Sequence, residues 1–412
     1  MELTSGQEIA LQNIRDLQNR YLDGGGIGVI SGYAGTGKTT LISVINDGWK
    51  DCIVVTPTGK ASLRVKEATG ARAMTIHRWM YSVVEDEDTG DISFRKKEID
   101  LVEYPGPGFL IVDEASMLSF DVFKDLYEFC KRLQINLILI GDGFQLPPVE
   151  ADVKKQAFSV FNDDFPAHFK VQLTEIHRQA QNSPIIRASM AVRNGRWVEE
   201  SLSEVETVKP DDLTNEGHEV WSNEGVVICH KNATRNALNR SIRAKEHLEL
   251  GPLQVGGPLL VTKNNYFYDI YNGEVLNILE PVKTLKHQVV RDRANNASTY
   301  VDFQTTEVVT PSGRKEILLG DKDVLGTLGE VSSYSVYRNA KDIIWEKDLK
   351  GQISFVNANL GYCLTNHKAQ GSEWNDVLFV LESSVRLNSS EGRRFVYTGL
   401  TRAKKRVRIC WY

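Results

Sequence analysis

Residues 32–39, with the sequence Gly-Tyr-Ala-Gly-Thr-Gly-Lys-Thr, restrict the fold more than any other segment of the chain. They follow a short apolar stretch and precede a run with helical apolar spacing, which is the setting of a phosphate-binding loop between a strand and a helix. The glycines let backbone N–H groups surround phosphate oxygens, and the helix adds its positive end. A glycine turn that only caps a helix is the plain alternative, but the fixed positions and both flanking elements match the phosphate loop. We predict nucleotide contacts from this set: Gly32, Gly35, Thr36, Gly37, Lys38, Thr39 and Thr40.

Two adjacent carboxylates and one amide extend this prediction. Asp113 and Glu114 follow an apolar run, so one can hold Mg²⁺ while the other accepts a proton from the attacking water. We assign Asp113 and the Thr39 hydroxyl to the metal, Glu114 to the base, and Lys38 to the β and γ phosphates of ATP. Gln145 follows another apolar run and is expected at the γ-phosphate, although a loop stopped by prolines is a plain alternative there. These features alone fit a small-molecule kinase, a GTPase or a motor.

Composition limits the class of protein. The chain has 412 residues, 41% of them hydrophobic and 25% charged, which is typical of a globular protein with two or more domains. A net charge of −5 argues against nucleic-acid binding by overall positive charge, so any polyanion site must be a local groove.

No apolar run is long enough for a membrane span, and we expect a cytoplasmic protein, in a bacterial or phage-infected cell, with no membrane association. The five cysteines have no metal-binding spacing and are expected as buried thiols: Cys52, Cys130, Cys229, Cys363 and Cys410.

Short apolar runs that alternate with helical segments predict an α/β fold with parallel sheets. Two stretches depart from this pattern. From about Val261 to Ile353 the chain has many short alternating stretches and turn signals, which predicts a small β insertion. From about Tyr81 to Gly108 an acidic run, a basic run and a Pro-Gly-Pro segment predict a hairpin arm that projects from the first half.

Six ordered segments give the chain its resemblance to a known family. Besides residues 32–39 and 109–114, they are 141–149 (GDGFQLPPV), 173–178 (LTEIHR), 365–373 (TNHKAQGSE) and 396–403 (VYTGLTRA). In this order they resemble superfamily 1 DNA helicases of the RecD-like, 5′-to-3′ branch, and among these the compact phage helicases. The resemblance spans about residues 3 to 412.

The resemblance implies two RecA-like lobes with the ATP site between them. It implies a lobe 1A over residues 1–170 with a hairpin arm 1B at 81–108, a lobe 2A over 171–260 and 354–412, and an SH3-like β-barrel insertion 2B at 261–353. Arg178 and Arg402 of the second lobe would reach the γ-phosphate, and Glu373 would contact the nucleotide. A cation that crosses a cleft stabilises the transition state only when the cleft is shut. Gln7 matches the adenine-reading glutamine, but Thr4 and Gln7 also fit a helix capping box.

The same resemblance implies a track for single-stranded DNA over both lobes. Such a track needs hydrogen-bond donors for phosphates and flat groups for bases. Phe94, in the projecting arm, would stack on the last base pair; packing against its own lobe is the plain alternative. Thr58 and Thr75 could instead be helix caps, His77 a partly buried histidine with its hydrogen bonds satisfied, and Lys60 a solvated side chain. The candidates are Pro57, Thr58, Lys60, Thr75, His77 and Phe94 from the first lobe, and Lys231, Asn232, Thr365, His367 and Lys368 from the second.

Together these features predict a monomeric ATP-dependent DNA helicase that uses ATP and Mg²⁺ and acts on single-stranded DNA and tailed duplexes. Single-strand-binding or replication proteins are its candidate partners. Two other functions stay open at this point. One is an ATPase that strips proteins from single strands without unwinding a duplex, and the other is a P-loop kinase of a small substrate.

Overall fold

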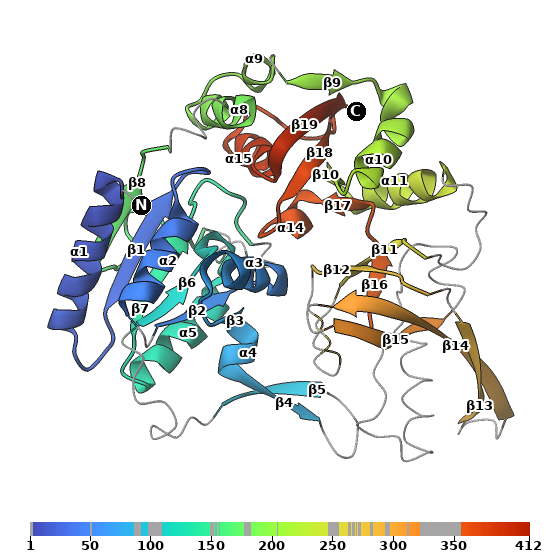
Figure 1. Ribbon diagram of the computed structural model, residues 1–412, viewed down its shortest axis with the longest axis horizontal. Coiled ribbons are helices and arrows are strands. Elements are labelled where there is room, and N and C mark those ends of the chain that lie inside the picture. Colours follow the sequence, from blue (N-terminus) through green and yellow to red (C-terminus); the bar gives the residue numbers. More distant parts are fainter. Residues whose placement is uncertain are drawn as a thin grey trace.

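The structure, a computed structural model, contains two parallel sheets side by side, with antiparallel strands attached to each (Figure 1). It describes residues 3–49, 52–85, 92–97, 109–148, 152, 155, 157–176, 183–203, 205–245, 255–262, 265, 268, 270, 273–280, 283–292, 297–310, 313–321 and 356–412. Within these ranges no helix is long and apolar enough to cross a membrane.

The first sheet has six parallel strands in the order β3-β2-β6-β7-β1-β8. The strands are β1 (Ile27–Gly32), β2 (Cys52–Thr56), β3 (Ala73–Thr75), β6 (Phe109–Val112), β7 (Asn136–Gly141) and β8 (Phe169–Leu173). One face packs on α1 (Ser5–Arg20), α2 (Lys38–Gly48) and α3 (Gly59–Thr69), and the other on α4 (Ile76–Met80) and α5 (Phe120–Arg132). Because both faces are covered, the central strands are continuous apolar runs, as the sequence predicts. We call this sheet and its helices the first lobe.

The second sheet has five parallel strands in the order β17-β10-β18-β19-β9. These strands are β9 (Glu206–Val208), β10 (Val226–Cys229), β17 (Cys363–Thr365), β18 (Trp374–Leu381) and β19 (Ala403–Trp411). One face packs on α10 (Leu213–Ser222) and α11 (Asn232–Lys245). The other packs on α8 (Pro184–Arg193), α9 (Val198–Ser201) and α15 (Ser390–Leu400), and the short helix α14 (Asn366–Ala369) follows β17. We call this sheet and its helices the second lobe, and the α/β fold with parallel sheets is confirmed.

Antiparallel strands occupy both stretches that depart from the helical pattern. In the first lobe β4 (Tyr81–Glu85) pairs with β5 (Ile92–Lys96). Beside the second lobe lie the sheets β12-β11-β16 and β13-β14-β15 (Figure 1). Their strands are β11 (Pro258–Val261), β12 (Val275–Asn277), β13 (Lys283–Asp292), β14 (Ala297–Thr310), β15 (Gly313–Asp321) and β16 (Ala358–Leu360).

Strand pairing moves two of the boundaries that the sequence suggests. The first sheet ends at Leu173 rather than at residue 170, because β8 pairs in parallel with β1. The antiparallel part begins at Pro258 and closes at Leu360, because β11 pairs with β16. Val308 and Ile317 of its strands join the core under α10 and α11, so this part shares a core with the second lobe.

Asn239 of α11 joins a helix to the edge of the second sheet. Its Oδ1 accepts from the Cys363 N–H at 2.8 Å, and its Nδ2 donates to the Cys363 carbonyl at 3.1 Å. Both groups are buried, so no bulk solvent can replace the amide.

Replacing Asn239 by alanine should lower the free energy of unfolding by roughly 2–4 kcal/mol, because two buried backbone groups lose their partners. Chemical denaturation followed by circular dichroism measures this change. The control is Arg240→Ala, an exposed position on the same helix, with an expected change below about 0.5 kcal/mol. Equal losses in the two variants would contradict the role of Asn239.

Candidate functional site

The predicted nucleotide residues follow three strands that lie next to each other in the first sheet, β6, β7 and β1. The phosphate loop follows β1, the Asp113-Glu114 pair follows β6, and the loop from Asp142 to Leu146 follows β7. In a parallel sheet all carboxyl ends meet at one edge, which is where ligands bind in open α/β folds. The topology therefore brings the three predicted segments together.

The loop before α2 has the backbone geometry of a phosphate site. Gly35 and Gly37 have φ values of 80° and 76°, a left-handed conformation that glycine adopts without strain. No side chain caps α2, so the first N–H groups of this helix point toward the loop without a capping partner. Lys38 Nζ donates to the carbonyls of Gly32 at 2.8 Å and Tyr33 at 2.9 Å, which places this cation inside the loop.

Gln7 takes part in the helix cap and also touches the phosphate loop. The backbone N–H of Gln7 donates to Thr4 Oγ1 at 3.3 Å, and Gln7 Oε1 accepts from the Thr4 N–H at 2.9 Å. Gln7 Nε2 also donates to the Gly37 carbonyl at 3.1 Å. The capping box is thus present, and a contact between Gln7 and adenine stays a prediction.

Asp113 and Glu114 are buried side by side, with 2% and 4% of their surface exposed. Glu114 has φ 56° and ψ 40°, a strained conformation for a residue with a side chain and one that is typical of functional sites. Asp113 Oδ2, Glu114 Oε2 and Gln145 Oε1 are buried and have no hydrogen-bond partner among the described residues. Oxygen atoms of this kind fit Mg²⁺ and water molecules around it.

Arg64 of α3 is the cation closest to these carboxylates among the ion pairs of the described residues. Its Nη2 lies 3.0 Å from Glu114 Oε1 and 3.6 Å from Asp113 Oδ2. Burial alone would raise the pKa of Glu114, but Arg64, ahead of Arg402 and Lys38, holds this pKa below its usual range. Burial, and then the charge of Glu114, raises the pKa of Asp113 to about 6. The pair therefore depends on cations from other segments.

Arg402 is buried in the second lobe and its charge acts on Glu114. Its Nε donates to the Thr398 carbonyl at 3.1 Å, its Nη1 to the Ser372 carbonyl at 3.1 Å, and its Nη2 to Thr401 Oγ1 at 3.2 Å. Glu373, the other second-lobe candidate, pairs with Arg64 at 3.4 Å. Arg178 lies outside the described residues.

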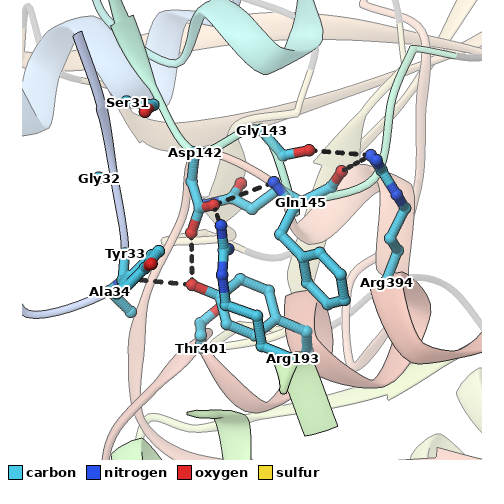
Figure 2. A network of polar contacts seen from close by, with 12 residues as sticks. Ser31, Gly32, Tyr33, Ala34, Asp142, Gly143, Gln145, Arg193, Arg394 and Thr401 are labelled. Atoms are coloured by element: carbon cyan, nitrogen blue, oxygen red, sulfur yellow. Dashed lines mark hydrogen bonds and ion pairs between the residues drawn. The ribbon is translucent and has the colours of Figure 1, made fainter. Parts of the chain in front are cut away.

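Three second-lobe side chains that the sequence analysis did not select hold the Asp142–Leu146 loop (Figure 2). The Tyr397 hydroxyl donates to Asp142 and accepts from the Ala34 N–H at 3.2 Å. Arg193 Nη1 donates to Asp142 Oδ1 at 2.9 Å, and the Arg193 guanidinium lies 4.1 Å from the Tyr33 ring centroid. Arg394 Nη1 donates to the Gly143 carbonyl at 2.9 Å.

Two more hydrogen bonds between the lobes end on Leu146 of the same loop. The Leu146 N–H donates to Thr398 Oγ1 at 3.0 Å, and Gln370 Nε2 donates to the Leu146 carbonyl at 2.7 Å. The loop that carries Gln145 is thus bonded to α15 and to the residues around α14.

The first-lobe candidates for DNA binding gather beyond β2 and β3, of which β3 is the edge strand of the sheet and β2 its neighbour. Thr58 caps α3 and Thr75 caps α4, so both hydroxyls have the structural role of a helix cap. Lys60 Nζ lies 4.1 Å from the centroid of the Trp374 ring of the second lobe. Burial lowers the pKa of His77. The side chain of Phe94 lies outside the described residues, and its backbone pairs with Val83.

The second-lobe candidates gather beyond β10 and β17, of which β17 is the edge strand of the second sheet and β10 its neighbour. Lys231 precedes α11, its N–H donates to Glu382 Oε1 at 3.0 Å, and Asn232 Oδ1 accepts from Arg235. Thr365 precedes α14, which contains His367 and Lys368. Burial lowers the pKa of both His367 and Lys368. Each lobe therefore presents one polar cluster at the carboxyl edge of its sheet.

Family models match both ends of the chain. A model described as "AAA domain" matches residues 2–211, about half of the chain. A model described as "UvrD-like helicase C-terminal domain" matches residues 360–410, which contain β17, β18, α15 and most of β19.

Curated relatives carry the names of DNA helicases. The "ATP-dependent RecD2 DNA helicase" of Deinococcus radiodurans is 27% identical over 400 residues, which cover 92% of this chain and 46% of the relative. The "ATP-dependent DNA helicase dda" of Enterobacteria phage T4 is 32% identical over 209 residues, or 48% of this chain and 44% of the relative. The chain thus matches less than half the length of these two relatives.

Among solved structures, the chain resembles a Bacteroides Pif1 helicase whose crystals hold ADP-AlF3 and single-stranded DNA. The TM-score is 0.56 at 20% identity, with 99% of this chain and 92% of that chain covered. A Pif1 helicase from Candida albicans has a TM-score of 0.52 at 17% identity, and the match covers 95% of that helicase chain. At these identities the likeness concerns the fold.

Replacing Tyr397 by phenylalanine removes one hydroxyl that joins Asp142 and Ala34 between the lobes. We expect a loss of about 1–3 kcal/mol of stability, seen as a lower melting temperature, because Asp142 is buried and loses a donor. Differential scanning calorimetry measures the change. Tyr412→Phe, at an exposed position, serves as the control and should leave the melting temperature unchanged. A melting temperature for the Tyr397 variant equal to that of the control would refute the role of this hydroxyl.

Proposed function

Because the chain belongs to the superfamily 1 helicases, we propose that it is an ATP-dependent DNA helicase that moves along single-stranded DNA in the 5′-to-3′ direction. Hydrolysis takes place at the pocket of Lys38, Glu114 and Gln145, which the second lobe completes. The observation that carries the proposal is the Asp142–Leu146 loop, which comes from the nucleotide lobe and is bonded to Tyr397, Thr398 and Gln370 of the other lobe.

The proposed chemistry uses groups of both lobes. The N-terminus of α2 and Lys38 bind the β and γ phosphates, and Glu114, kept ionised by the cations around it, accepts the proton of the attacking water. Mg²⁺, held by Thr39 and Asp113, would neutralise phosphate charge when bound. Arg178 and Arg402 supply positive charge from the second lobe. Gln145 senses the γ-phosphate by donating from its Nε2 amide, and its Oε1, which has no partner among the described residues, accepts from the attacking water.

Movement along DNA follows from the positions of the two polar clusters, one on each lobe, that bind single-stranded DNA in this proposal. Thr58, Lys60 and His77 belong to the first lobe, whereas Lys231 and His367 belong to the second. When the lobes open and close around ATP, the distance between the clusters changes, so each can hold the strand in turn. The names of the RecD2 and Dda relatives support DNA as the polymer, and the likeness to the RecD-like branch supports the direction.

The domain assignment is part of the proposal. Residues 1–170 form a RecA-like lobe 1A, whose sheet is completed by β8 up to Leu173. Residues 171–260 and 354–412 form lobe 2A. The β4–β5 pair and the residues up to 108 form arm 1B, in which Phe94 stacks on the duplex end. Residues 261–353 form the SH3-like insertion 2B, supported by the antiparallel strands β12 to β15. We propose a monomer, with replication or single-strand-binding proteins as partners.

Strand displacement tests the function and its direction. The protein should separate duplexes with a 5′ single-stranded tail and leave those with a 3′ tail intact, and oligo-dT should strongly stimulate its ATP turnover. Lys38→Ala is the control, with turnover lowered about 100-fold or more because the phosphates lose their cation. Unwinding from the 3′ tail alone would refute the direction. If the protein removes bound proteins from single strands but leaves every naked duplex intact, its function is protein stripping and not unwinding. If DNA does not change its ATP turnover, the chain is a small-molecule kinase.

DNA affinity should depend on pH through Lys60. Burial, and then the nearby Lys404, lowers the pKa of Lys60 to about 8. Lys60 is charged below this pH and neutral above it, and a phosphate binds only the charged form, so affinity should fall as the pH rises through about 8. Fluorescence anisotropy with labelled oligo-dT, from about pH 7 to about pH 9.5, measures the fall. In Lys60→Arg the charge persists and this part of the fall should vanish. An identical pH profile in Lys60→Arg would show that Lys60 does not bind the strand.

A further inference from the structure

Helix α3 of the first lobe packs tightly on residues 371–374 of the second. Lys60 lies on the Trp374 ring, and Arg64 Nη1 lies 3.4 Å from Glu373 Oε1. A Cβ atom added to Gly371 would lie 3.0 Å from Thr58 Oγ1 and 3.3 Å from Ala61 Cβ, so the Gly371 backbone lies close to these two side chains. Gly371 also has φ +73°, which favours glycine. We call this contact the α3 joint.

The same helix reaches the catalytic carboxylates. Lys60 and Arg64 are four residues apart and so lie on one side of α3, one turn from each other. While Arg64 Nη1 faces Glu373 across the joint, its Nη2 faces Glu114 at 3.0 Å and Asp113 at 3.6 Å. A single guanidinium therefore bridges the proposed general base, the proposed metal ligand and the second lobe.

This ion-pair cluster differs from a surface salt bridge. The Glu114 and Asp113 side chains are 5% and 3% exposed, and the Arg64 side chain is 25% exposed. Burial alone would lower the pKa of Arg64, but Glu114 and then Asp113 raise this pKa above its usual range. Arg64 Nη2 holds Glu114 Oε1 by a hydrogen bond, and the same cation lies beside Asp113, where Mg²⁺ would have to bind.

We propose that Arg64 is a positioning residue that restrains Glu114 and Asp113 while no strand is bound, and that strand binding at Thr58 and Lys60 releases them. This inference rests on the proposed function. A phosphate that binds Lys60 draws it from the Trp374 ring, and α3 then moves away from residues 371–374 as one rigid helix. Arg64 loses its Glu373 anchor in the same movement, because both contacts belong to one joint. Glu114 is then free to accept a proton.

Arg64→Gln tests the restraint, and Lys66→Gln is the matched control because it removes an equal charge from an exposed position of the same helix. ATP turnover without DNA should rise at least about fivefold in Arg64→Gln, the size of an ordinary coupling between two sites. Turnover at saturating oligo-dT should change by less than about twofold, because strand binding has already released Glu114. Lys66→Gln should match the wild type in both conditions.

A second measurement does not depend on turnover. If DNA binding must break the Arg64 contacts, part of the binding free energy is spent on breaking them. A variant without these contacts should therefore bind single-stranded DNA more tightly, by that same coupling free energy. Nucleotide-free Arg64→Gln should therefore bind labelled oligo-dT at least about fivefold more tightly than wild type, although it has lost a positive charge. Glu373→Gln, which removes only the second-lobe anchor, should shift both readouts in the same direction and covers the case in which Arg64→Gln does not fold.

Two results would overturn the inference. Turnover that falls in Arg64→Gln with and without DNA would make Arg64 a catalytic residue that contacts the nucleotide. Strand affinity that weakens as it does in Lys66→Gln would remove the coupling. Failure of the proposed function appears earlier and separately, as a wild-type turnover that oligo-dT does not change, and the release mechanism would fall with it.

Discussion

Two carboxylates, Asp113 and Glu114, are buried next to each other at the edge of a parallel sheet, and the rest of the structure depends on how their charge is compensated. Two adjacent buried anions are unstable unless cations lie close by. The charges of Lys38, Arg64 and Arg402 supply that compensation, from the phosphate loop, from α3 and from the second lobe. The pocket is therefore stable only as an assembly of distant segments, and any ligand that brings or removes charge changes the balance among them.

The two buried carboxylates and their cations lie between two contacts that join the first lobe to the second. On one side, the Asp142–Leu146 loop is bonded to Tyr397, Thr398 and Gln370. On the other side, α3 packs on residues 371–374. The two contacts converge in the second lobe, because Gln370 directly precedes the segment that α3 touches. The Asp142–Leu146 loop and helix α3 thus contact the same short stretch of chain.

Features with local determinants are the ones that the sequence predicts. The phosphate loop, the carboxylates after β6 and the buried strands are consecutive residues, so their pattern is visible in the chain. Arg193 and Arg394 have no such pattern, because each acquires its role only when the lobes come together around Asp142 and Gly143. Arg64 had one usable signal, its spacing of four residues from Lys60 on a helix. Gln7 shows the limit of a motif, since one amide satisfies the helix cap and the family pattern alike.

The polar clusters on the two lobes differ in how they are held, and this difference bears on which lobe responds to a strand. In the first lobe, Thr58 is both the cap of α3 and part of the α3 joint, so a contact at Thr58 acts on a helix that also carries Arg64. In the second lobe, the backbone N–H groups of His230 and Lys231 are held by the buried Glu382 carboxylate, which follows β18 and lies away from Asp113. No described contact links Glu382 directly to the catalytic carboxylates. In the proposed mechanism, the first-lobe cluster therefore has the direct connection to hydrolysis, and the second-lobe cluster has the role of holding the DNA strand while the lobes move.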